Sequence, residues 1–211
     1  MPNWCENKLT ITGPADEVKK FREIAEPLSM ARLLPIPEEL KCIHYVGGPS
    51  GAKHFTTEEG FPAVDYSGVV DLWERKRYRT VGDKNIPLSD EEQEELFKKY
   101  GARDWYEWTV KHWGTKWDLY PDDLKDKEIT GAEVAGGVEY RFDTAWGPPI
   151  PFFLYLSQTF PSLAFHVYFI DFPNFEGESW LKEGQVVRDE CWGPFDIQEE
   201  CERQSSNKGG A

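Results

Sequence analysis

The sequence predicts an α+β fold, in which helices pack on a β-sheet, and three patterns support this prediction. Polar and apolar residues alternate over 8–12 and over 137–143, as they do in strands with one buried face. Apolar residues recur at helical spacing over 15–26, and an apolar segment over 150–159 follows a proline pair that can open a helix. The stretch 163–170 is apolar on both faces, which is typical of a central strand.

The N-terminal segment predicts a strand followed by a helix. Leu9 and Ile11 alternate with polar neighbours and are followed by Gly13 and Pro14, a turn signal. The helix over 15–26 carries two acidic residues in its first turn, where the helix dipole favours negative charge. Two prolines within 33–37 then prevent the chain from continuing as a helix.

Residues 38–88 are expected to be rich in loops, with one helix over 71–79. That segment, DLWERKRYR, is a dense basic cluster in an acidic chain. Its residues Arg75, Arg77 and Arg79 are candidates for contact with a phosphate or an acidic partner. The alternative is a solvated face that balances nearby acidic residues.

Two further helices are predicted before residue 113. Ser89 and Glu92 fit a capping box, so a helix should begin there and run to about residue 100. Its expected buried side is Leu96, Phe97 and Tyr100. A second helix over 103–112 has apolar residues on two sides, which indicates packing on both.

The C-terminal half completes a recognisable order of elements. Gly136 and Gly137 suggest a hairpin between a strand near 129–134 and the strand over 137–143. The full order is strand, helix, long insertion, strand, strand, helix, strand, which is the split βαβ order of a ferredoxin-like sheet. Residues 180–192 indicate an added hairpin or edge strand.

These elements predict one domain over residues 1–211. Its expected parts are a ferredoxin-like core of 1–34 and 128–175, a helical and loop insertion of 35–127 after the first helix, and a C-terminal hairpin with an acidic tail of 176–211.

The chain is strongly acidic, which bears on its partners. It has 38 Asp and Glu against 24 Lys and Arg, for a net charge of -14, which disfavours nonspecific binding to nucleic acid. Residues 171–203 hold ten acidic against three basic residues. The four cysteines form no CxxC pair and the four histidines give no zinc spacing, so no metal or cofactor is expected. We expect a cytoplasmic protein, because no secretory signal or membrane-length apolar run occurs.

Four motifs in order carry a resemblance to a known family: MPNWCEN leading into LTITG, WGTKWD, TAWGPP, and a Phe-Pro followed by a strand within 160–177. Together they resemble the YubB-type ferredoxin-like domain family, small proteins of plasmids and phages. The resemblance implies the ferredoxin-like fold and a mobile-element origin in a bacterial cytoplasm. It implies no reaction and no catalytic residues.

The stretch HWGTKWD, residues 112–118, supports two interpretations. In the structural one, Trp113 and Trp117 pack an inserted helix onto the sheet and onto Trp146, while Lys116 and Asp118 form ion pairs or cap exposed backbone. In the functional one, the tryptophans form a platform on which a base or sugar stacks.

The leading functional hypothesis is a non-enzymatic binding protein of a phage or plasmid that antagonises a host defence complex by occupying a basic, nucleic-acid-binding surface. The candidate acidic faces are within 90–95 and 171–202, with Glu91, Glu92, Glu94, Glu95, Glu199 and Glu200 as candidate residues. The alternative is a single-stranded nucleic-acid binder or a small enzyme that uses the tryptophan-rich edge with Arg75, Arg77 and Arg79.

Overall fold

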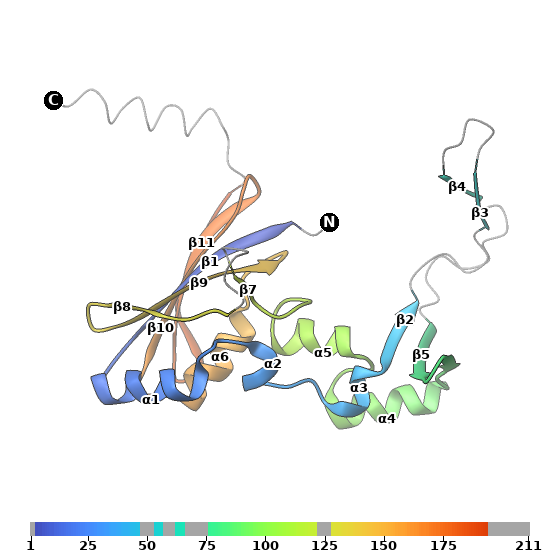
Figure 1. The fold of residues 1–211 in the computed structure, drawn as a ribbon, viewed down its shortest axis with the longest axis horizontal. Helices are drawn as coiled ribbons and strands as arrows, with labels where there is room; N and C mark the ends of the chain where they lie inside the picture. Colours follow the sequence, from blue (N-terminus) through green and yellow to red (C-terminus); the bar gives the residue numbers. More distant parts are fainter. Residues whose placement is uncertain (1–2, 47–52, 57–61, 66–75, 122–127, 194–211) are drawn as a thin grey trace. The chain divides into compact units, whose positions relative to one another are not determined.

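The computed structural model describes residues 3–46, 53–56, 62–65, 76–121 and 128–193. The chain divides into two compact units (Figure 1). The first, called the sheet unit, comprises Met1–Pro35 and Thr109–Ala211, and the second, called the insert unit, comprises Ile36–Trp108. The expected insertion of 35–127 therefore contains the insert unit and, in addition, residues that belong to the sheet unit. The description of 1–211 as one domain stays a prediction.

The sheet unit contains a large antiparallel sheet with helices. Its elements are β1 (Trp4–Thr12), α1 (Ala15–Ala25), α2 (Met30–Leu33), β7 (Tyr120–Pro121), β8 (Ala132–Val134), β9 (Gly137–Ala145), α6 (Ile150–Thr159), β10 (Ala164–Asp171), β11 (Phe175–Lys182) and β12 (Gln185–Trp192).

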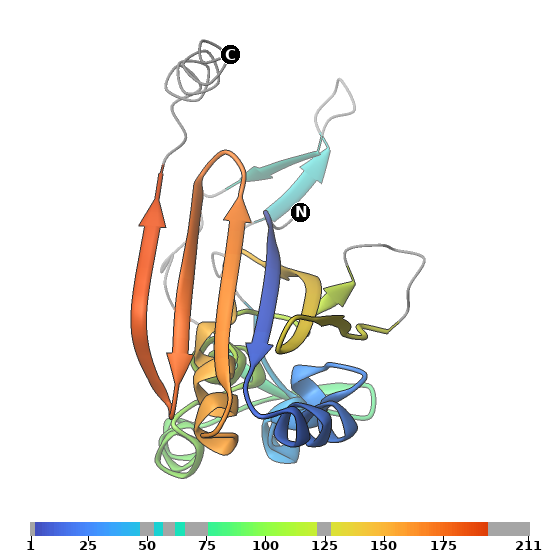
Figure 2. The same cartoon turned by 90° about the vertical axis from the view of Figure 1, so that its left-hand side faces the viewer.

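The strand order confirms the predicted fold class. The sheet runs β12-β11-β10-β1-β9-β7, and β8 also pairs with β9. Within it, β1, α1, β8, β9, α6 and β10 follow each other in the split βαβ order of a ferredoxin-like domain. The β11–β12 hairpin extends this sheet beyond β10, so these strands lie side by side with β1 in Figure 2. It is the added hairpin that the C-terminal sequence indicated.

One face of the sheet is buried and the other is open. Alternate residues of β1, β9 and β10 are buried, as period-two side-chain alternation requires. On the buried face, Phe21 of α1 makes edge contacts with Tyr140 and Phe165, at ring-centroid distances of 6.4 and 5.9 Å. Phe152 and Phe153 of α6 are fully buried as well. In the described part of the sheet unit, α1 and α6 pack on this face, and we call the opposite side of the sheet the open face.

A partly buried carboxylate ties α1 to the hairpin of β8 and β9. Glu26 accepts hydrogen bonds from Arg22 Nε at 2.8 Å, the Tyr140 hydroxyl at 3.0 Å and the Gly131 amide at 3.2 Å. Burial alone would raise the pKa of Glu26, but the hydrogen bonds from Arg22 and Tyr140 outweigh it and lower that pKa. The charged form of Glu26 is therefore the one that stabilises the fold.

The insert unit is built from short strands and one longer helix. Its elements are α3 (Glu38–Lys41), β2 (Ile43–Val46), β3 (Lys53–Thr56), β4 (Pro62–Asp65), β5 (Lys76–Val81), β6 (Lys84–Pro87) and α4 (Asp90–Tyr100), and α5 (Trp105–His112) spans the boundary between the units. Strands β2, β5 and β6 form one sheet and β3 and β4 another.

The helix predicted over 71–79 is wrong where the structure describes it. Residues 76–79 belong to β5, which pairs with β2 and β6 on its two sides. Alternation of Arg77 and Arg79 with Tyr78 is compatible with a strand, and pairing on both sides overrides helix propensity. Residues 71–75, which include Arg75, lie outside the described residues.

Helix α4 has the predicted start. The Ser89 side chain accepts from the Glu92 amide at 3.2 Å and the Glu92 carboxylate accepts from the Ser89 amide at 2.9 Å, which confirms the capping box. Leu96 is buried as expected. Phe97 is exposed instead, because the Arg103 guanidinium, 4.3 Å from its ring centroid, gives the ring a cationic partner at the surface.

Candidate binding surface on the open sheet face

Exposed aromatic rings gather at one end of the open face. The Trp4 ring lies 5.0 Å from that of Tyr120 and 6.1 Å from that of Trp117, measured between centroids. The Lys116 ammonium lies 4.5 Å from the Trp117 ring and 5.7 Å from the Trp146 ring. We call these five residues the aromatic edge. Trp4, Tyr120 and Trp146 are 39%, 46% and 45% exposed, so large apolar surface remains in contact with water.

Trp146 is held in an unusual backbone conformation. Its φ of 73° is in the left-handed region, which a bulky residue rarely adopts. Its amide donates to the Asn3 carbonyl at 2.9 Å, which fixes the turn beside the first strand. Backbone strain of this kind costs on the order of 1–3 kcal/mol and recurs at binding sites. An exposed tryptophan on a strained turn is thus a reasonable binding residue.

Two residues of the HWGTKWD stretch have structural roles. Trp113 is only 3% exposed, and its indole Nε1 donates to the Leu34 carbonyl at 2.9 Å, so it belongs to the core and not to the aromatic edge. Asp118 accepts from Ser29 Oγ at 2.7 Å and from the Met30 amide at 2.6 Å, at the start of α2. The sequence predicted that Asp118 either forms an ion pair or caps exposed backbone, and the structure shows it capping backbone amides. Lys116 and Trp117 remain partly exposed.

Charged residues lie in rows across the centre of the open face. Lys8 of β1 is directly opposite Arg141 of β9, and Glu6 is directly opposite Asp143. Like charges that face each other in an antiparallel pair destabilise a sheet, by up to about 1 kcal/mol. Lys8 and Arg141 thus form a positive row across β1 and β9. Glu6 and Asp143 form a negative row next to it.

A polar hollow of about 350 Å³ lies over these two rows. Its wall also includes Tyr168 and Ile170 of β10, the strand on the other side of β1. The Tyr168 hydroxyl donates to Glu176, and the Lys8 ammonium lies 5.4 Å from the Tyr168 ring centroid. Burial and the contact with Glu176 raise the pKa of Tyr168 to about 12, so the hydroxyl stays protonated.

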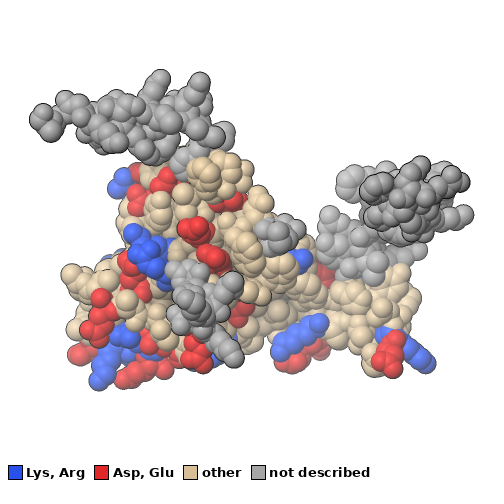
Figure 3. Space-filling view, turned by 45° about the horizontal axis from the view of Figure 1, so that its top comes forward, with Lys and Arg blue, Asp and Glu red and all other residues tan. Residues whose placement is uncertain are grey.

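A third group on the open face is a stack of three side chains. The rings of His166 and Trp180 are nearly parallel, 9° apart with centroids at 4.6 Å, and the Arg188 guanidinium lies 4.6 Å from the Trp180 ring centroid. Glu178 contacts His166 Nε2 at 2.6 Å, and Glu190 pairs with Arg188. The carboxylates of the acidic C-terminal strands thus engage neighbours on the same face. Acidic and basic side chains are interspersed on the face seen in Figure 3.

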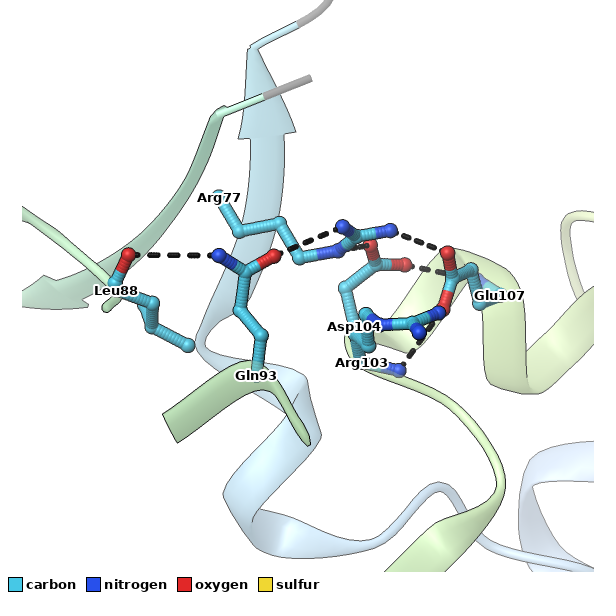
Figure 4. A network of polar contacts seen from close by, with 6 residues as sticks. All are labelled: Arg77, Leu88, Gln93, Arg103, Asp104 and Glu107. Carbon is cyan, nitrogen blue, oxygen red and sulfur yellow. Dashed lines mark hydrogen bonds and ion pairs between the residues drawn. The ribbon is translucent and has the colours of Figure 1, made fainter. Parts of the chain in front are cut away.

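The basic cluster of the insert unit is arranged differently (Figure 4). Arg77 is 7% exposed, and its Nε donates to the fully buried Asp104 at 2.6 Å. The same guanidinium pairs with Glu107 and donates to Gln93 at 3.1 Å. The network leaves Arg77 turned inward, which gives it a structural role in this unit. Arg79 is partly exposed and pairs with Glu92 at 3.2 Å.

The candidate acidic residues of α4 have mixed surroundings. Glu91, Glu94 and Glu95 are exposed, and Glu94 lies 3.8 Å from Lys98. Glu92 serves the capping box, and its bond from the Ser89 amide lowers its pKa. Glu199 and Glu200 lie outside the described residues.

The described part of the chain has no metal-binding cluster, and its buried Cys5 thiol is protonated at neutral pH. No group of three or more His, Cys, Asp or Glu side chains there could hold a metal ion. Cys5 is fully buried, and burial together with the nearby Asp171 charge raises its pKa to about 12, so the thiol is not ionised at neutral pH. Among the same described residues, no helix reaches the length and apolarity needed to cross a bilayer.

A family model agrees with the ferredoxin-like fold. Residues 116–207 match the family model described as a ferredoxin-like domain in Api92-like protein. A crystal structure of the protein api92 from Yersinia pseudotuberculosis matches with 12% identity and a TM-score of 0.43, over 93% of this chain and 100% of that one. Among curated proteins, none matches the chain significantly.

The sequence prediction found part of this surface and missed part. Lys116, Trp117 and Trp146 were predicted, and the structure brings them together. Trp4 and Tyr120 were missed. Trp4 shares its strand face with Lys8, so extending the alternation of the first strand backwards by four residues would have placed it on the open side.

Proposed function

We propose that this chain is a non-enzymatic binding protein that docks on a basic surface of a partner protein through the aromatic edge. The observation that carries the proposal is the group of exposed rings at one end of the sheet, Trp4, Tyr120 and Trp146, with the Trp117 ring beside that of Trp4. Tryptophan and tyrosine are the residues that most often dominate the binding energy of protein interfaces. Water-exposed clusters of them on a folded sheet indicate a contact surface.

The charge of the chain supports a basic partner. A net charge of -14 raises the rate of encounter with a positive surface and repels acidic competitors. The exposed carboxylates of Glu91, Glu94 and Glu95 on α4 add to this field. Because long-range steering is screened by salt, the association should weaken at high ionic strength.

We also propose a biological setting for this partner binding. The resemblance to plasmid and phage proteins leads us to place the chain in the cytoplasm of a bacterial host. There an acidic protein can antagonise a host defence complex by occupying the basic surface that the complex uses for nucleic acid.

The proposal is tested by capture from a bacterial lysate on tagged protein, at low salt and at about 0.5 M salt. The double variant Trp4→Ala with Tyr120→Ala is compared with Tyr155→Ala, which removes an exposed ring on α6, away from the open face. We expect one stoichiometric partner that is retained by wild type and by Tyr155→Ala, and lost in the double variant and at high salt. Equal retention by all three proteins at both salt concentrations would refute the proposal.

A second candidate, binding of single-stranded nucleic acid, has one observation in its favour. Lys116 lies beside two partly exposed tryptophan rings, where it can meet the phosphate of a stacked base. The burial of Arg77 removes one of the three arginines that this candidate would use. A labelled oligonucleotide at low salt decides the matter: binding should depend on Lys116 and Trp117, and no binding eliminates the candidate.

A further inference from the structure

The hollow on the open face differs from the aromatic edge in its chemistry. Its central side chains are four charges, Glu6 and Lys8 from β1 and Arg141 and Asp143 from β9. Its volume of about 350 Å³ is in the range of small-ligand sites. The hollow is therefore large enough for a compact molecule and lined for a charged one.

The pairing of the charges is the unusual feature. In this register each charged side chain directly faces one of its own sign, Lys8 against Arg141 and Glu6 against Asp143. Exchanging the charges of Glu6 and Lys8 would place opposite charges in both pairs and favour folding. The observed arrangement instead concentrates positive charge at one end of the hollow and negative charge at the other, which favours a ligand with both charges.

The carboxylate of Glu6 is available to such a ligand. It is exposed, and it makes no hydrogen bond or ion pair with any residue in the described part of the chain. Lys8 is partly exposed, with its ammonium above the Tyr168 ring. Arg141 pairs with Glu139 at 2.7 Å, further along the same strand. Tyr168, opposite Lys8, and Ile170, opposite Glu6, supply the less polar wall of the hollow from β10.

We propose that this hollow binds a small zwitterion, with its cationic group at Glu6 and Asp143 and its carboxylate at Lys8 and Arg141. Residues two apart on a strand are separated by about 6.6 Å, so the two charges of the ligand must be several bonds apart. A zwitterion has no net charge, so the overall charge of -14 does not oppose its binding as it opposes that of a nucleotide. The site is independent of the partner-binding function proposed above.

The test uses a series of amino acids with increasing separation of charge: glycine, 4-aminobutanoate and 6-aminohexanoate. Hexanoate and hexylamine serve as probes with a single charge. Binding to the full chain is followed by amide NMR shifts on titration. We expect the long zwitterions to bind saturably and at least tenfold more tightly than glycine or either single-charge probe. The shifted amides should be those of residues 6–8, 141–143 and 168–170.

Variants distinguish binding at the hollow from nonspecific attraction between the ligand and charged side chains elsewhere. Glu6→Gln and Lys8→Met should each weaken binding of 6-aminohexanoate at least tenfold. Matched changes on α4, Glu94→Gln and Lys98→Met, alter an exposed ion pair elsewhere and should leave the affinity unchanged. Unchanged spectra away from the hollow show that each variant is folded. Equal affinity for zwitterions and single-charge probes, or equal effects of the two pairs of variants, overturns the proposal.

Discussion

The open face of the sheet unit and strand β5 of the insert unit place the same kinds of residue in opposite surroundings. On the open face, Lys8 and Arg141 stay at the surface, and the Lys8 ammonium lies over the Tyr168 ring. On β5, Arg77 is turned inward, and its partner Asp104 is fully buried. The packing on each side of the sheet thus decides which basic residues of this protein are available for binding.

The buried ion pair of Arg77 and Asp104 and the charges of the open face should have different roles. A buried ion pair must be complete, because removing one partner leaves an uncompensated charge away from water. Charges on an open face are solvated, so the loss of one changes the folding free energy by at most about 1 kcal/mol, and relief of a like-charge pair favours folding. Changes at Arg77 should therefore affect stability, and changes on the open face should affect binding.

The largest effect is expected from Arg77→Met. The variant leaves Asp104 buried without its guanidinium, which should lower the free energy of unfolding by about 3–5 kcal/mol. Urea unfolding followed by tryptophan fluorescence measures it. Adding Asp104→Asn to this variant removes the carboxylate charge, keeps an acceptor for the Glu107 amide at the start of α5, and should recover part of the loss. A loss below about 1 kcal/mol in the single variant would mean that the network is unimportant.

A smaller effect with a pH signature is expected from Glu26→Gln. Because hydrogen bonds from Arg22 and Tyr140 lower the pKa of Glu26 in the folded state, its stabilisation is complete above the ordinary value of 4.5. It is lost as the pH falls through the lower folded value. At pH 7 the variant should be less stable by about 1–2 kcal/mol, and this difference in the free energy of unfolding should shrink as the pH falls below 4.5. If this difference in stability stays constant from pH 7 to pH 3, the charged form of Glu26 is not what stabilises the fold.

Ser89→Ala should cost about 1 kcal/mol, because α4 loses one half of its capping box. Ser89→Asp keeps an acceptor for the Glu92 amide and should restore most of that stability. Thermal unfolding of the two variants beside wild type makes the comparison. If alanine and aspartate behave alike, the capping bond has no measurable effect in the insert unit.

The sequence predicted the structure of a segment well where local packing decides that structure, and poorly where long-range contacts decide it. Alternation identified the strands of the sheet unit, because one buried face leaves a period of two in the residues themselves. Over 71–79 the same reasoning failed, since pairing of β5 with β2 and β6 is a long-range fact that the local pattern does not contain. Trp113 and Trp117 look equivalent in the sequence, yet Trp113 is buried and donates to the Leu34 carbonyl, whereas Trp117 stays partly exposed. The charge rows could not be predicted either, because they depend on the register between β1 and β9.

The most direct test of the account measures stability and partner affinity in parallel for the Trp4→Ala, Tyr120→Ala double variant. We expect the free energy of unfolding to stay within about 1 kcal/mol of wild type, since both rings are exposed. Affinity for the partner captured by wild type should fall at least tenfold, or by about 1.4 kcal/mol of binding free energy. An unchanged affinity, or a loss of several kcal/mol in stability, would contradict the claim that the open face serves binding and not folding.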